Sequence, residues 1–165
     1  MTEPTARVAV LMGSGSDADI VEKCTNVLRD LGIPHEVRVL SAHRTPEETA
    51  AYISGAKDRG IRVVVAAAGM AAHLAGACAA HSFLPVIGIP IASGPLEGRD
   101  ALLSTVMMPP GIPVATVGIN GAANAGHLAA QILALQDEAL AARIVTNRES
   151  MREKVFDQDR DIGGR

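Results

Sequence analysis

A histidine and an arginine stand next to each other where the sequence predicts a turn between a strand and a helix. His43 and Arg44 follow the strand-like run 35–40 and directly precede Thr45 and Pro46. Thr45 is expected to cap the helix that follows, with Pro46 in its first turn. His43 and Arg44 are not needed to begin that helix, so both side chains can face a ligand, at the kind of turn where α/β enzymes place their chemistry.

The segment 13–17, Gly-Ser-Gly-Ser-Asp, offers small residues, free backbone N–H groups and hydroxyls after another strand-like run. Such a loop at a helix N-terminus is suited to hold a phosphate, and Arg44 would supply the countercharge. A charge-assisted hydrogen bond of this kind contributes roughly 1.5–3 kcal/mol net. Ser16 could instead cap the helix in a capping box with Asp19. Asp17 could favour the helix dipole or accept from ribose hydroxyls.

Strands and helices alternate along the chain, which predicts an α/β fold with a flavodoxin-like, doubly wound parallel sheet of about five strands. The expected strands are 7–12, 35–40, 62–67, 85–89 and 114–118. The expected helices are 16–31, 46–59, 71–81 and 98–107, followed by a long helical pattern over 122–156. In the strand order 2-1-3-4-5 the winding reverses between strands 1 and 3, so the loops after strands 1, 2 and 3 surround one crevice.

Those three loops contain the residues that could bind or react. They are Ser14, Ser16 and Asp17 in the first loop, Ser41, His43 and Arg44 in the second, and Gly69 and His73 in the third. For His73, contact with a ligand and hydrogen bonding at the helix terminus are equally open. The other three histidines are assigned structural roles: His35, His81 and His127. No metal site is expected, because neither His43 nor His73 has a close His or Cys partner at metal-site spacing.

The chain of 165 residues, 48% of them hydrophobic, is long enough for one domain with its own core. We expect a single domain over 1–156, with a helical C-terminal part over 122–156, and a disordered tail over 157–165. Apolar residues recur at helical spacing in that part, at Leu133, Leu135, Leu140 and Ile144. Together these residues carry more apolar surface than one sheet edge can cover, which indicates contact with another subunit.

A net charge of −3 gives no broad cationic surface, so neither nucleic acid nor an anionic membrane is expected as a partner. Aromatic residues make up only 2%, which argues against stacking of a flat cofactor. Cys24 and Cys78 make no disulfide framework, so a reducing cytoplasm is the expected location. The N-terminal segment lacks the apolar core of a secretory signal. The apolar run 63–80 is interrupted by glycines and His73, and we interpret it as a buried strand and helix rather than a membrane span.

Gly13, Gly15 and Ala18 also satisfy a dinucleotide-binding fingerprint. That interpretation requires an acidic residue at the end of the second strand, where the sequence has Ser41 and His43. A phosphoacceptor receiver domain is disfavoured too, because no acidic pair follows the first strand. A dinucleotide-binding protein and a receiver domain are therefore both less favoured than a protein that binds a small phosphorylated ligand.

Several different motifs follow one another along the chain, each occurring once. They are Met12-Gly-Ser-Gly-Ser-Asp17, Ser41-Ala-His-Arg-Thr-Pro46, Ala71-Ala-His-Leu74, Leu102-Leu-Ser-Thr105 leading to Met108-Pro109, Gly111-Ile-Pro-Val114 and Gly121-Ala-Ala-Asn-Ala125. Over about residues 8–135 the chain closely resembles the PurE family, the 5-(carboxyamino)imidazole ribonucleotide mutases of purine synthesis. The resemblance implies a three-layer α/β/α subunit, an octameric assembly, a ribonucleotide substrate, and no metal, ATP or organic cofactor.

The resemblance also implies roles. Ser14, Asp17 and Arg44 match family positions that bind the ribonucleotide, and His43 matches the acid/base residue. The family moves a carboxylate from the exocyclic nitrogen of an aminoimidazole to ring carbon C4, by releasing CO2 and adding it back. One histidine can donate the proton for the first step and remove the C4 proton in the second.

Some positions depart from the family pattern. Ala67, Met70 and Ala75 stand where many members have Gly, Gly and Pro, and Met107 stands where Gln is frequent. Two other functions stay open. A related carboxylase branch adds free CO2 to the unmodified aminoimidazole ribonucleotide, but its members usually have Lys after the loop histidine, so Arg44 favours the mutase. The third possibility is a non-catalytic nucleotide-binding module that uses the same cleft.

Overall fold

Five parallel strands form one sheet in the order β2-β1-β3-β4-β5 in the computed structural model, which describes residues 5–163. The strands are β1 (Val8–Met12), β2 (His35–Val39), β3 (Val63–Gly69), β4 (Val86–Ile91) and β5 (Ala115–Thr116). The winding reverses between β1 and β3, so a crevice opens at their carboxyl ends. The predicted flavodoxin-like strand order is confirmed.

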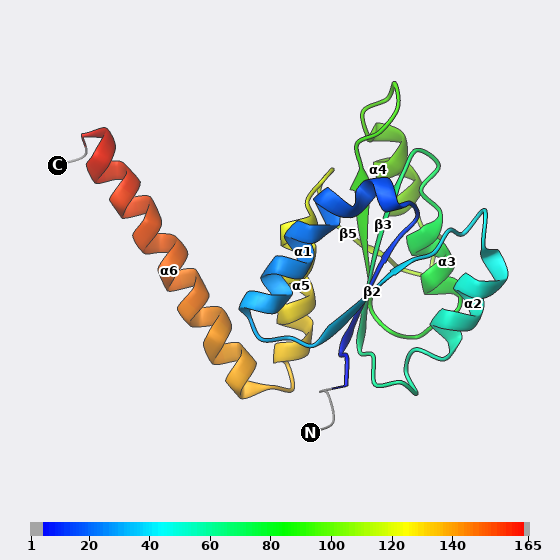
Figure 1. The fold of residues 1–165 in the computed structure, drawn as a ribbon, viewed down its shortest axis with the longest axis horizontal. Helices are drawn as coiled ribbons and strands as arrows, with labels where there is room; N and C mark the ends of the chain where they lie inside the picture. The colour runs from blue at the N-terminus through cyan, green and yellow to red at the C-terminus, as the bar shows by residue number, and fades with distance from the viewer. Residues whose placement is uncertain (1–4, 164–165) are drawn as a thin grey trace.

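Helices cover both faces of the sheet and complete the three expected layers (Figure 1). The helices are α1 (Ala18–Asp30), α2 (Pro46–Ser54), α3 (Leu74–Ala80), α4 (Arg99–Val106), α5 (Ala122–Ala134) and α6 (Glu138–Ile162), with a short 3-10 helix, η1 (Gly15–Asp17), before α1. α1 and α5 pack together on one face, and α2, α3 and α4 lie on the other. The six α-helices and five strands within residues 5–163 confirm the α/β class.

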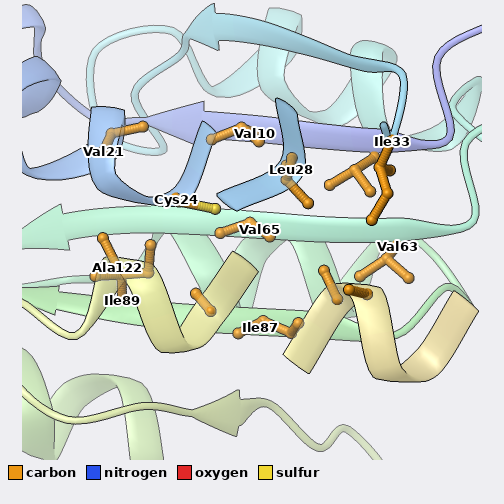
Figure 2. Close-up of a cluster of buried hydrophobic side chains, with 14 of the residues drawn as sticks. Val10, Val21, Cys24, Leu28, Ile33, Val63, Val65, Ile87, Ile89 and Ala122 are labelled. Atoms are coloured by element: carbon orange, nitrogen blue, oxygen red, sulfur yellow. The ribbon is translucent and has the colours of Figure 1, made fainter. Parts of the chain in front are cut away.

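Successive residues of the central strands point into opposite layers, as the two-residue period of a strand requires. Val10 and Val65 face α1 and α5, where Leu28 joins the same cluster (Figure 2). Leu11 and Val64 point the other way, into the cluster beneath α2 and α3. Burial on both faces explains why β1 and β3 are almost continuous apolar runs in the sequence.

The helix expected over 71–81 begins only at Leu74. Met70 has a φ of 54°, in the left-handed region, which turns the chain after β3. The Ala72 N–H then donates to the hydroxyl of Ser104 on α4, at 3.2 Å, instead of to the chain around it. The residues before Leu74 therefore form a loop at the crevice rather than a helical turn.

β5 is shorter than the strand expected over 114–118. The Val117 N–H donates to the Gly88 carbonyl at 3.1 Å, and the Asn120 N–H donates to the Pro90 carbonyl at 2.9 Å. Pro90 has no N–H to donate back to β5. The regular ladder therefore stops at this proline, although the chain continues alongside β4.

The long helical pattern expected over 122–156 is divided into two helices, α5 and α6. An Asp137 carboxylate oxygen accepts from the Leu140 N–H at 2.9 Å and so caps α6. α6 continues through Ile162 and ends at Gly163, whose φ is 102°. The stretch 157–162 is helical where the sequence suggested a disordered tail, and an Arg160–Asp157 ion pair supports its last turns. Residues 164 and 165 of that suggested tail lie outside the described part.

Only the first turns of α6 pack on the rest of the fold. Leu140 is buried, and the Arg143 Nε donates to the Leu31 carbonyl at 2.9 Å. Beyond these contacts α6 leads away from the sheet to the C-terminus (Figure 1). Within residues 5–163, no helix has both the length and the apolar character that crossing a membrane would need.

Candidate active site

A cleft of about 510 Å³ opens at the carboxyl ends of the central strands. Residues that follow β1, β2, β3 and β4 line it. All the residues that the sequence predicted for the site lie in this lining: Ser14, Ser16, Asp17, Ser41, His43, Arg44, Gly69 and His73. Segments that are far apart in the chain thus meet in one chamber, as the strand order predicted.

In the first loop, the side chain of Ser14 caps the short 3-10 helix η1. The Ser14 Oγ accepts from the Ser16 N–H at 3.3 Å and from the Ser16 hydroxyl at 2.9 Å. Ser14 therefore caps η1, whereas α1 has Asp17 at its N-cap position without a side-chain capping bond, so Ser16 caps neither helix. Two hydroxyls and the main chain of η1 border the cleft together, which makes this loop suitable for an anion.

Asp17 lines the cleft with only 9% of its surface exposed. The Ser16 hydroxyl lies 3.3 Å from its Oδ1. Burial raises the pKa of Asp17 above the ordinary value of 3.8, although hydrogen bonds with Ser16 and Ser14 and the charge of Arg44 act in the opposite direction. A carboxylate partly removed from water is a strong acceptor for the hydroxyl of a ligand.

In the second loop, Thr45 stands at the N-cap position of α2 as predicted, but its side chain does not cap the helix. The Thr45 Oγ1 accepts from the Ser41 N–H at 2.9 Å and donates to the Ser41 carbonyl at 3.1 Å. The Ser41 Oγ accepts from the Arg44 N–H at 3.2 Å. These bonds close the turn over 41–45 and hold His43 on its cleft side.

The Arg44 guanidinium joins the second loop to the first. Its Nη2 donates to the Gly13 carbonyl at 2.7 Å, and its Nε donates to the Ser41 Oγ at 3.4 Å. The permanent positive charge is thereby held beside the hydroxyls of the first loop. An arginine fixed in this way supplies the countercharge for a phosphate without a cationic surface around it. Ser14, Ser16 and Arg44 could together hold an anion, and we call this group the anion cradle.

The imidazoles of His43 and His73 are in direct contact. The His43 Nε2 and the His73 Nδ1 lie 2.6 Å apart, and the rings meet edge to face at 84°. One of these nitrogens must carry the proton of the hydrogen bond and the other must accept it. His73 is also the N-cap residue of α3, but its side chain makes no capping bond there. The side chain of His73 thus lines the cleft and makes no hydrogen bond at the helix terminus, and its contact with a ligand stays a prediction.

The sequence missed the contribution of the fourth loop. Ser93 follows β4 and lines the cleft, where its hydroxyl occupies the space beside Gly69 that any side chain there would need. The Ser104 hydroxyl of α4 holds the third loop through the Ala72 N–H. β4 lies next to β3 in the sheet, so its following loop also opens at this edge. That topological signal could have identified Ser93.

The two cysteines and His35 lie in surroundings that indicate structural rather than catalytic roles. Cys24 and Cys78 are buried, and burial raises the pKa of each thiol to about 12, so both stay protonated and neither is an activated nucleophile. The His35 Nδ1 lies 2.9 Å from the Ile33 carbonyl, in keeping with its structural assignment. Among residues 5–163, no three His, Cys, Asp or Glu side chains are grouped to hold a metal ion.

Comparison with known proteins assigns the chain to a family. The sequence profile of AIR carboxylase matches residues 7–154. This chain belongs to the AIR carboxylase family. The N5-carboxyaminoimidazole ribonucleotide mutase of Mycobacterium tuberculosis (strain CDC 1551 / Oshkosh) is 49% identical over 94% of this chain and 90% of that protein. The protein of the same name from Bacillus subtilis (strain 168) is 48% identical over 91% of this chain and 94% of its own length.

Solved structures give the same assignment. The crystal structure of Treponema denticola PurE superposes on this AIR carboxylase family member with a TM-score of 0.85 and 31% identity, covering 96% of this chain and 99% of that one. The crystal structure of a Treponema denticola PurE2 variant gives a TM-score of 0.87 with 28% identity, over 97% and 99% of the two chains. The resemblance to the PurE family that the motifs indicated is therefore confirmed.

Proposed function

We propose that this chain is an N5-carboxyaminoimidazole ribonucleotide mutase that acts in purine biosynthesis. The observation that carries the proposal is the meeting of the anion cradle and a hydrogen-bonded imidazole pair in one cleft. Relatives with 48% and 49% identity bear this name, which supports the assignment. The reaction is an isomerisation, because one carboxylate changes its position on the same aminoimidazole.

Each part of the cleft suits one part of a ribonucleotide. The hydroxyls of Ser14 and Ser16 and the guanidinium of Arg44 would hold the phosphate. Asp17 would accept a hydrogen bond from a ribose hydroxyl. The base would then extend toward His43 and the third loop.

In the first step, His43 acts as the general acid. The bond between the exocyclic nitrogen and the carboxylate carbon breaks, its electron pair stays on nitrogen, and nitrogen takes the proton of the His43 imidazolium. The carboxylate leaves as CO2. An imidazole suits this task because its pKa lies near neutrality.

In the second step, the same histidine acts as the general base. Ring carbon C4 forms its new bond to the carbon of CO2, and neutral His43 removes the C4 proton. The histidine returns to its starting protonation state, and no electrons enter or leave. We propose that the reaction uses no organic cofactor, ATP or metal, as the PurE resemblance implies.

His73 would position His43 through the hydrogen bond between their nitrogens. This bond fixes the orientation of the His43 ring and gives its proton a defined place between the two steps. Confinement is equally necessary, because CO2 held beside C4 recombines at a high effective concentration instead of diffusing away.

The test is a conversion assay. Purified protein is incubated with carboxyaminoimidazole ribonucleotide without ATP or added bicarbonate, and formation of the C4-carboxylated isomer is followed. We expect conversion well above the spontaneous rate, and absence of such conversion refutes the mutase. The family description names a carboxylase, so aminoimidazole ribonucleotide with dissolved CO2 is tested in parallel. Faster turnover of that pair would identify the carboxylase instead.

Substitution of the acid/base residue separates an enzyme from a binding module. His43→Asn should leave ribonucleotide affinity within about threefold and lower kcat by about 10²–10⁴-fold, the usual contribution of general acid–base catalysis. Binding is measured by calorimetry and turnover by the conversion assay. His81→Asn, at an exposed position outside the cleft, is the matched control and should keep full turnover.

We further propose that the protein works in the cytoplasm as a homo-oligomer, with eight subunits as the PurE resemblance implies. The projecting helix α6 supports this assembly, since much of its apolar surface is not covered by its own subunit. We propose no nucleic acid or membrane as a partner.

A further inference from the structure

Met70 is a residue of the cleft wall to which the proposed function gives no task. Its φ of 54° is a backbone conformation that side chains other than glycine rarely adopt. The surrounding structure holds it there: the Ser104 hydroxyl lies 3.4 Å from the Met70 carbonyl and accepts the Ala72 N–H at 3.2 Å. Unfavourable backbone conformations that are held in this way gather at functional sites.

The side chain of Met70 reaches across to the fourth loop. Its Cγ, Sδ and Cε lie 3.8–4.0 Å from the point that a Cβ on Gly94 would occupy. Ser93, the preceding residue of the fourth loop, fills the space beside Gly69. The Met70 side chain therefore lies beside Gly94, next to the place where Ser93 approaches Gly69.

Met70 borders both the cleft and the solvent. It lines the cleft, and 56% of its surface is exposed. It belongs to the same loop as His73, whereas the anion cradle is formed by the first loop and Arg44. The neighbouring wall is apolar, from Ala71 and Leu74.

We propose that Met70 is the gate that retains CO2 while the carboxylate is transferred. This inference rests on the proposed function. CO2 is small and uncharged, so no ion pair can hold it, and its retention depends on a physical barrier at the mouth. A methionine side chain has three rotatable bonds and can move aside for the ribonucleotide while the backbone stays fixed. Met70 thereby sets the fraction of carbon that is transferred rather than lost.

The gate is tested by following the transferred carbon. Substrate with a ¹³C-labelled carboxylate is converted in unlabelled bicarbonate with carbonic anhydrase present, and mass spectrometry measures the label in the C4-carboxylated product, corrected for a blank without protein. Met70→Gly should raise the unlabelled fraction of the product about threefold or more over the native chain, because exclusion from solvent is lost. Free aminoimidazole ribonucleotide should rise with it.

Two variants keep the result interpretable. Met70→Leu retains the bulk and should keep the label nearly as the native chain does. Met151→Ala removes a 43%-exposed methionine of α6, which does not line the cleft, and should leave the label in the product unchanged. Glycine accepts the φ of position 70, so Met70→Gly should unfold at or above the native temperature.

The outcomes separate the gate from the function. If the native chain converts the substrate and Met70→Gly keeps the label equally well, the gate is wrong and the mutase stands. If the native chain converts nothing, the mutase is wrong and the gate falls with it. Loss of label in Met70→Gly alone supports both.

Discussion

Burial of the Asp17 carboxylate works against folding, and we propose that it favours ligand binding. The surrounding residues exclude water from the carboxylate. Its pKa is raised because burial outweighs the hydrogen bonds with Ser16 and Ser14 and the charge of Arg44, all of which lower the pKa. A ribose hydroxyl would supply the hydrogen bond that water no longer gives. The residue is therefore placed for a ligand at some cost to the empty protein.

We expect Asp17→Asn to stabilise the empty protein and to weaken ligand binding. The amide carries no charge to desolvate, so the thermal midpoint at pH 7 should rise by about 1–3 °C. Loss of the charged acceptor should raise the Kd for the ribonucleotide about tenfold. Scanning calorimetry and titration calorimetry measure the two effects.

The stabilisation should depend on pH in a defined direction. Because the folded-state pKa of Asp17 lies above 3.8, its unfavourable contribution is complete above the raised value and disappears as the pH falls toward 3.8, where both states become protonated. The variant and native midpoints should therefore converge in acid. Asp19→Asn, an exposed neighbour, should give no stabilisation at any pH. A less stable Asp17→Asn protein at pH 7 would contradict this account.

At the scale of elements, the turn between β2 and α2 is closed by a threonine that leaves its helix uncapped. Thr45→Val keeps the shape of the side chain but removes both hydrogen bonds to Ser41. We expect a loss of about 1–2 kcal/mol in stability and a kcat about tenfold lower, because His43 is no longer held in position. Denaturant unfolding and the conversion assay provide the measurements.

Two further substitutions show whether the effect comes from the turn. Thr45→Ser retains the hydroxyl and should recover most of the kcat. Thr25→Val removes a local bond to the Glu22 carbonyl within α1, far from the turn, and should lower stability without lowering kcat. Equal kcat values for the valine and native proteins at position 45 would show that these hydrogen bonds have no part in positioning His43.

The elements themselves were largely predictable, because local pattern decides them. β1 and β3 are recognisable as apolar runs, and the order 2-1-3-4-5 placed His43 and His73 in one crevice from the sequence alone. The position at which the long helical pattern divides was missed, although Asp137 before Glu138 is an N-cap signal. The position of the Met70 side chain beside Gly94 was beyond reach, since it depends on how two loops from different strands approach each other.

At the scale of the whole molecule, α6 is the element that its own subunit covers least. Val145, Val155 and Phe156 expose 56%, 60% and 41% of their surfaces along a helix of 25 residues. If this surface packs against other subunits, sedimentation velocity should give a particle of about eight times the 17.1 kDa chain mass.

Charge placed on that surface should break the assembly. The double variant Val155→Glu with Phe156→Glu should sediment as smaller species at micromolar concentration, because a buried unpaired charge is unfavourable. Glu153→Gln, on the same exposed stretch, should leave the sedimentation of the native chain unchanged. A native chain that sediments as a monomer would remove the proposed assembly, and unaltered sedimentation of the double variant would show that these residues are not in the interface.

The ion pair between Arg7 and Asp137, at 2.7 Å, joins residues separated by 130 positions, one before the first strand and the other at the start of the last helix. The ribosome must synthesise most of the chain, up to Asp137, before this ion pair can form. β1 and α1 must likewise wait for α5 to cover their shared apolar layer. Folding of this protein therefore finishes late in synthesis, and an incomplete chain exposes its central strands to chaperones and proteases until α5 and Asp137 emerge.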